Sequence, residues 1–239
     1  MSGVSYQPAD RRAVQIMHAA RDIFLAEGWD HFSMERIAEH LECSRPLVYK
    51  HFGCKEEILL ALAIESKRRR VRFYERAVDF DGRPREKFVG IGECESYLFP
   101  RDLPIELFVA STAIRAKTSR ARRDELNALD LRAIGLSTNI VREAIDVGDL
   151  QLAPSIKVED FFFCSWAMRW GAFNLIRSDT PLEQAGMDRP REIVDHSLAR
   201  MLDSYNWRPL RTEWDYRATL TRLRAEAFPE KVVNEILNS

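Results

Sequence analysis

The chain has 239 residues, of which 46% are hydrophobic, and a formal net charge of −1. This content is ample for a packed core, and no apolar run approaches the about 20 residues of a membrane-spanning helix. The N-terminal residues MSGVSYQPADRR lack the hydrophobic stretch of a signal peptide, so we expect a cytoplasmic protein with no membrane contact. The four cysteines and five histidines lack metal-ligand spacing, so neither a disulfide framework nor a metal site is expected.

The first predicted helix runs from about Ala9 to Glu27, with apolar residues recurring at a period of 3.6. Gly28 is placed to end it in a left-handed conformation. The segment Ser33–Lys55, SMERIAEHLECSRPLVYKHFGCK, then predicts two short helices around a tight turn, with serines as N-caps. A further helix begins at Lys55 and continues to about Phe80. This order is typical of a helix-turn-helix DNA-binding head.

The second helix of the pair carries the residues expected to face DNA. Arg45 is the first choice for base recognition, since a guanidinium donates two hydrogen bonds to guanine. Pro46 or Leu47 is placed to touch a thymine methyl group, and Lys50 suits a base or a phosphate. Residues 1–60 hold seven Lys/Arg and nine Asp/Glu, a net charge of −2, so a DNA-binding face must come from placement and not from bulk charge.

The head resembles that of the TetR family of bacterial transcriptional regulators. The residues that carry the resemblance are Phe24, Gly28, Ser33, Ile37, Ala38, Ser44, Tyr49, His51, Phe52, Lys55 and Glu56. The resemblance implies a homodimer that binds a palindromic operator in double-stranded DNA and releases it when a small molecule fills a C-terminal pocket. Separately, no GxSxG or HExxH motif appears in the sequence, so no enzymatic activity and no cofactor are expected. By family position, the residues expected to contact DNA phosphates are Ser33, Tyr49, His51 and Lys55. Ser44 is also expected at the DNA-binding surface. Tyr49 and His51 have the alternative of simply packing the head.

The remaining sequence predicts an all-α protein: a three-helix head joined by a long helix to a helical ligand-binding and dimerisation domain. We expect a DNA-binding domain over 1–55, the second domain over 56–206 and a helical extension over 207–239. The further helices are expected at about Arg85–Tyr97, Ile105–Ala116, Arg122–Val147, Val158–Ile176 and Ile193–Tyr205, with two shorter ones in the extension. The sequence FPRDLP at 99–104 is expected to separate the first two of these.

Polar residues among aromatic ones in the middle helices predict a ligand pocket. The candidates are Glu93, Tyr97, Phe108, Arg115, Trp166, Arg169, Trp170 and Phe173. An aromatic stripe at helical spacing is also typical of plain core, and Glu93 and Arg169 could pair with each other instead of a ligand.

Small residues on the aromatic helix, together with the apolar stripe of the next one, predict a four-helix dimer interface. Its candidate residues are Ala167, Gly171, Asn174, Val194, Leu198, Met201 and Leu202.

Two further features of the sequence are a basic run and a cysteine beside the DNA-binding head. The basic run from Lys67 to Arg72 lies too far along its helix from the DNA and is expected to be a solvated face. Cys54, at a helix N-terminus beside Lys55, is expected to ionise easily, or simply to fill a capping position. A second reading of the whole chain is a DNA-bound adaptor whose effector is a protein contacted through the C-terminal region.

Overall fold

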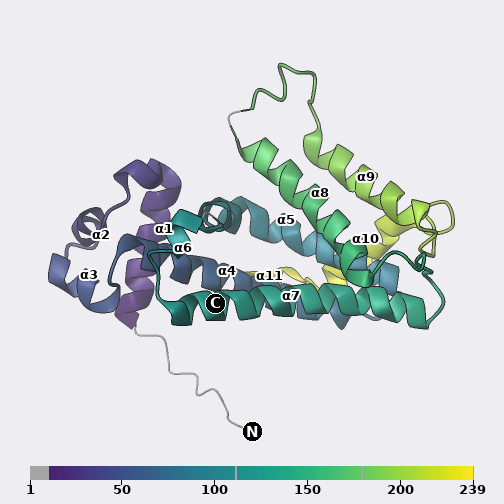
Figure 1. The fold of residues 1–239 in the computed structure, drawn as a ribbon, viewed down its shortest axis with the longest axis horizontal. Coiled ribbons are helices and arrows are strands. Elements are labelled where there is room, and N and C mark those ends of the chain that lie inside the picture. Colours follow the sequence, from purple (N-terminus) through teal and green to yellow (C-terminus); the bar gives the residue numbers. More distant parts are fainter. Residues whose placement is uncertain (1–10, 111, 179, 239) are drawn as a thin grey trace, which may run out of the picture. The chain divides into compact units, whose positions relative to one another are not determined.

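The computed structural model describes residues 11–110, 112–178 and 180–238, and within them every regular element is a helix. The elements in chain order are α1 (Arg11–His31), α2 (Met34–His40), α3 (Arg45–His51), α4 (Lys55–Val78), α5 (Pro84–Val109), α6 (Thr112–Arg115), α7 (Arg120–Asp146), α8 (Val158–Arg177), α9 (Pro190–Ser204), α10 (Tyr216–Glu226) and α11 (Glu230–Leu237) (Figure 1). The expected all-α class is therefore confirmed. None of these helices is long and apolar enough to cross a membrane.

The N-terminal head forms as its sequence predicts, except that the Ser44 side chain makes no capping hydrogen bond at the start of α3. Gly28 has φ 75°, a left-handed conformation that interrupts α1 before its last residues. The hydroxyl of Ser33 accepts a hydrogen bond from the Arg36 amide and caps α2. Pro46 occupies the first turn of α3, where its missing N–H costs nothing. The core of the head is closed by fully or nearly fully buried apolar side chains: Ile16, Ala20, Ile23, Phe32, Ile37, Val48 and Phe52.

Helix α5 corrects the expectation of a break at residues 99–104. It continues as one helix from Pro84 to Val109, through Pro100 and Pro104. A proline inside a helix costs on the order of 3 kcal/mol. The cost is offset because the same helix buries Leu98, Leu103, Ile105 and Val109 almost completely, and each such side chain contributes about 1.5–3 kcal/mol.

The chain divides into two compact units. The first holds the head with the rest of residues 11–66 and 102–128, and the second holds residues 67–101 and 129–238. These units cut across the three ranges expected from the sequence, because α4, α5 and α7 each begin in one unit and end in the other.

The second unit has a large aromatic and aliphatic core. Phe73, Phe161 and Trp207 are fully or nearly fully buried in it, from α4, α8 and the segment after α9. Within this unit α8 and α9 lie side by side as a helical hairpin (Figure 1).

The basic run on α4 corrects a second expectation. Arg69 and Arg70 are only 2% and 6% exposed, so this stretch is not a solvated face. Arg68 and Arg72 alone among its arginines are exposed. The reason is that α4 is buried on more than one side, and Arg70 meets a carboxylate there: its Nε donates to Glu95 Oε1 at 3.0 Å.

Candidate nucleic-acid interface and ligand cavity

Backbone hydrogen bonding and a left-handed residue form the turn between α2 and α3. The Cys43 amide donates to the Ala38 carbonyl at 3.0 Å, and Glu42 adopts φ 49° in the turn between α2 and α3. Val48 and Phe52 are buried beneath α3, as their spacing predicts. The opposite face of α3 is therefore fixed in orientation by the packing below it.

The residues expected to face DNA occupy that outer face. The side chain of Arg45 is 61% exposed and Tyr49 is 48% exposed. Ser44, Pro46 and Lys50 are exposed as well, whereas Ser33, Leu47 and His51 are half-buried. Arg45 lies 3.9 Å from Glu35, a loose pair between exposed groups that a phosphate or a base is able to replace.

Lys55 is held differently from the other basic residues of the head. Its Nζ donates to the Phe32 carbonyl at 2.8 Å and lies 3.7 Å from the centre of the Trp29 ring. The ammonium group thus fixes the end of α1 to the start of α4. An ammonium group has three N–H donors and this carbonyl takes one, so the position suits a phosphate contact as well as a structural one.

A carboxylate of the head is neutralised close to α2. The Arg36 guanidinium donates to both oxygens of Glu27, at 2.8 and 3.1 Å. The hydrogen bond from Arg36 lowers the pKa of Glu27 below its usual value. This pairing neutralises one carboxylate of the acidic head locally.

The structure contradicts the expectation that the Cys54 thiol ionises easily. Burial raises the pKa of its thiol, and the sulfur lies 3.6 Å from the Lys117 carbonyl oxygen. Desolvation outweighs the helix N-terminus at this position, so the thiolate is disfavoured.

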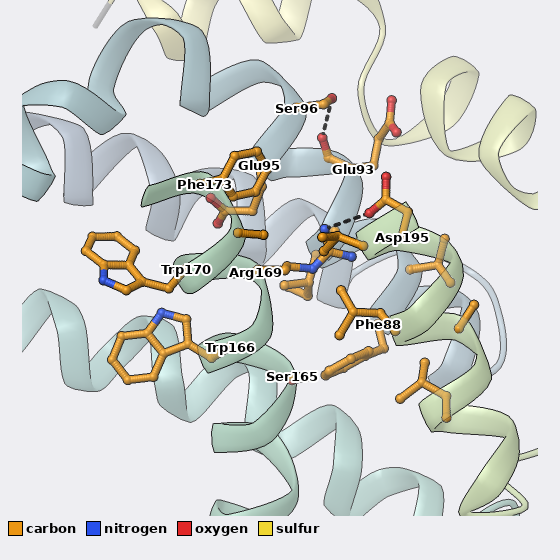
Figure 2. A pocket seen from close by; sticks show the side chains of 18 of the residues that line it. Phe88, Glu93, Glu95, Ser96, Ser165, Trp166, Arg169, Trp170, Phe173 and Asp195 are labelled. Carbon is orange, nitrogen blue, oxygen red and sulfur yellow. Dashed lines mark hydrogen bonds and ion pairs between the residues drawn. The ribbon is translucent and has the colours of Figure 1, made fainter. Parts of the chain in front are cut away.

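A cavity of about 490 Å³ lies in the second unit, walled by α4, α5, α7, α8, α9, α10 and Arg211 before α10. Of the eight candidates for ligand contact, five line it: Glu93, Trp166, Arg169, Trp170 and Phe173. Figure 2 shows Arg169 beside Asp195, with Phe88 on the same side of α8 and the two indoles on the other. The cavity combines aromatic and aliphatic side chains with polar and charged ones, as a small-molecule site does.

Three candidates lie elsewhere. Tyr97 stacks on Phe73 in the core, with ring centroids 5.7 Å apart. Phe108 packs against Trp29 in the first unit, where the ring centroids are 4.8 Å apart. Arg115 donates to the Val109 carbonyl, also in the first unit. Periodicity marks these residues as inward-facing but does not tell one buried environment from another.

Sequence reasoning missed a buried polar group in the cavity wall. Arg70 donates to both oxygens of Glu95, at 3.0 and 3.1 Å, and the Tyr74 hydroxyl donates to the same carboxylate. Burial and the nearby Glu95 raise the pKa of Tyr74 well above its usual value, so it stays a donor. The three residues lie on α4 and α5, and only the fold brings them together.

The outer face of α8 fits the expected interface only in part. Ala167, Gly171 and Asn174 are exposed, together with Phe163 at 59% and Leu175 at 53%. On α9, however, Leu198 and Leu202 are 4% and 5% exposed and line the cavity, so a second copy cannot reach them. Val194 and Met201 are half-buried, and the exposed apolar residue of α9 is Ile193.

The described residues contain no group of three or more metal-binding side chains. Taken together, the exposed α3 on a packed three-helix head and the all-helical body with its cavity define a helix-turn-helix protein.

Comparison with known proteins shows which helix-turn-helix proteins this chain is similar to. Residues 16–62 match the family model described as bacterial regulatory proteins, tetR family. Over 55 residues the chain is 36% identical to the HTH-type transcriptional activator FasR of Mycolicibacterium smegmatis, a match that covers 23% of this chain and 25% of that protein. The matched segments span about a quarter of the length of the curated relatives.

Solved structures share the fold over most of the chain. The TetR family transcriptional regulator PfmR of Thermus thermophilus has a TM-score of 0.62 at 22% identity, covering 81% of this chain and 98% of that one. SmeT of Stenotrophomonas maltophilia, solved as a complex with triclosan, has a TM-score of 0.57 at 19% identity, covering 82% and 92%. Residues 16–62 thus match the tetR family model, and most of the chain shares its fold with solved TetR family regulators.

Proposed function

We propose that this protein is a sequence-specific DNA-binding transcriptional regulator that binds a palindromic operator as a homodimer. The observation that carries the proposal is the outer face of α3, where Arg45, Tyr49 and Lys50 are exposed over a fully buried Val48. Such a helix presents charged and hydrogen-bonding groups to the major groove while its other side stays in the core. The family model covers the same segment.

We further propose that a small, largely apolar ligand releases the protein from DNA, so that it acts as a repressor. The cavity supports this role, and the related fold of SmeT holds triclosan. SmeT is named a repressor and FasR an activator, so the sign of regulation rests on experiment.

Release requires that the ligand distinguish two conformations. Moving a population from 1:99 to 99:1 takes about 5.5 kcal/mol of differential binding. Helices α4 and α5 each carry residues of the cavity and residues of the first unit. Repacking of either helix around a ligand therefore has a continuous path along which to act on the head.

The experiment is to incubate the purified protein with sheared DNA of its own genome at about 0.15 M salt, a level that screens weak non-specific contacts, and to sequence what it retains. Enrichment of one or a few palindromic sites is the expected result. A reporter gene behind such a site, with and without the protein, then gives the sign of regulation. Uniform recovery of all sequences would contradict specific binding.

The adaptor alternative has no specific observation in its favour. The tail that would carry the protein contacts buries Trp207, Leu223 and Phe228 within its own unit, at 0–2% exposure.

A further inference from the structure

The wall of the cavity carries more positive than negative charge. Among the described residues that line it, seven are basic, namely Lys67, Arg70, Arg85, Arg169, Arg191, Arg211 and Arg217, and four are acidic, namely Glu93, Glu95, Asp130 and Asp195.

Each of these four acids already has a basic partner. The pairs are Glu95 with Arg70, Glu93 with Arg224, Asp130 with Lys67 and Asp195 with Arg169. Within the described wall no acidic group is left over to attract a cationic ligand, whereas the excess of bases favours an anion.

Arg169 is a basic residue of the wall that a ligand can reach. Its side chain is 26% exposed, and among the described residues its one partner is Asp195, at 3.2 Å from Nη1. The Asp195 side chain is itself 64% exposed, so solvent screens this pair. Nη2 and Nε of Arg169 remain available as donors.

Gly92 on α5 gives the Arg169 guanidinium its place in the cavity. A Cβ added at Gly92 would lie 2.6 Å from Nη2, too close for two such atoms, and 3.2 Å from Cζ. The guanidinium therefore rests on a stretch of α5 that lacks a side chain. In Figure 2 it lies beside Asp195, near the Phe88 ring.

We propose that the ligand is an organic anion with an apolar body, whose acidic group is bound by Arg169 over Gly92. This inference rests on the proposed ligand-controlled function and names the chemistry of its ligand. The planar guanidinium offers a two-point hydrogen bond to a carboxylate, sulfonate or similar group. The apolar body lies against the aromatic residues of the wall, including Phe88 and Phe173.

A pair of fluorescent probes separates charge from shape. 8-Anilinonaphthalene-1-sulfonate and N-phenyl-1-naphthylamine share one ring system, and only the first carries an anionic group. Both are titrated into the full-length protein, and the ratio of the neutral probe's Kd to the anionic probe's Kd is compared between variants. We expect Arg169→Gln to lower this ratio about tenfold, the value of one charge-assisted contact, with little change for the neutral probe.

Three further variants sharpen the test. Arg169→Lys keeps the charge and should retain part of the preference. Gly92→Ala displaces the guanidinium and should lower the ratio about threefold, while alanine is a better helix residue than glycine. Arg189→Gln is the matched control, since Arg189 pairs with Glu192 at 3.2 Å and does not line the cavity. Thermal melting confirms that each variant is folded.

A ratio that is unchanged in Arg169→Gln, or an equal loss for both probes, would overturn the proposal. Operator binding of the same variants is measured without probe. If the wild-type protein prefers the anionic probe but retains no specific DNA sequence, the proposed function is wrong while the proposal of an anionic ligand is supported. If it retains specific DNA without the preference, the ligand class alone fails.

Discussion

Arg224 of α10 donates hydrogen bonds to both carboxylate oxygens of Glu93 on α5, at 2.8 and 3.4 Å. The Tyr97 hydroxyl donates to the same carboxylate at 3.2 Å. Burial, with the nearby Glu93, raises the pKa of Tyr97 to about 12, so this donor stays protonated. Glu93 thus pairs with the tail and not with Arg169, the partner considered from the sequence.

The tail is anchored at a second point by a buried arginine. Arg85 donates to the carbonyls of Trp207, Pro209 and Ala199 and to the carboxylate of Asp203, and its side chain is 1% exposed. One buried guanidinium thus joins α9 to the segment that follows it.

Arg85→Met should therefore lower the free energy of unfolding by about 3 kcal/mol, because it removes every hydrogen bond of a buried guanidinium together with the ion pair to Asp203. Urea unfolding at pH 7 measures the change. Arg208→Met is the control, since its pair with Glu213 is half exposed and should cost less than about 1 kcal/mol. If both variants lose an equal and small free energy of unfolding, the tail is loosely held, and the alternative of a DNA-bound adaptor with a protein partner gains support.

The helices of the head can be predicted from the sequence alone because the signals that define them are local. The Ser33 cap, the left-handed Gly28 and the buried Val48 each depend on residues a few positions away, and all three are found as expected. The family resemblance adds the order in which these local signals occur.

The cavity and α5 depend on contacts that are distant in the chain. The helix persists through Pro100 because burial of residues such as Leu98 and Leu103 offsets the lost hydrogen bonds. Likewise, Phe108 and Trp166 have the same aromatic character in the sequence, yet one packs in the first unit and the other lines the cavity. Periodicity gives the buried face of a helix but not its partner.

An acid-dependent contribution is expected from Glu56. Lys117 Nζ donates to Glu56 Oε1 at 3.0 Å, joining the start of α4 to the turn before α7. Burial alone would raise the pKa of Glu56, but the hydrogen bonds from Lys117 and its own backbone amide together outweigh it and lower the pKa below 4.5.

Because the folded pKa is lowered, the stabilisation is present above pH 4.5 and is lost as pH falls through the folded pKa. Glu56→Gln should cost about 1 kcal/mol at pH 7, a modest value since Lys117 is 66% exposed, and this cost should shrink as the pH is lowered below 4.5. Denaturant unfolding across this range measures the difference. A gap between variant and wild type that stays constant with pH would exclude the ionic origin.

On the DNA side, Arg45→Ala should cost about 1–3 kcal/mol of operator affinity and relax the choice of base at one position. Lys55→Ala should instead weaken binding to all sequences alike and reduce the salt slope by about one. Titrations with the operator and with single-base variants at several salt concentrations distinguish them. Lys55 also holds Phe32 and Trp29, so its variant is compared at a temperature where melting shows it folded. Equal, sequence-blind losses for both variants would contradict the assignment of Arg45.

The dimer interface proposed for the outer face of α8 has a clean test at Gly171. A Cβ added there meets nothing within 4 Å in the chain, and the residue is exposed. Gly171→Leu should therefore leave the single chain folded, and even gain helix propensity, while its bulk prevents close approach of a second α8. Analytical ultracentrifugation should show a shift toward monomer, and operator affinity should fall because one half-site is then bound at a time. Gly135→Leu on α7 is the matched control, since a Cβ at Gly135 also meets nothing within 4 Å. If both variants sediment as the wild type does, the small residues of α8 do not form the interface.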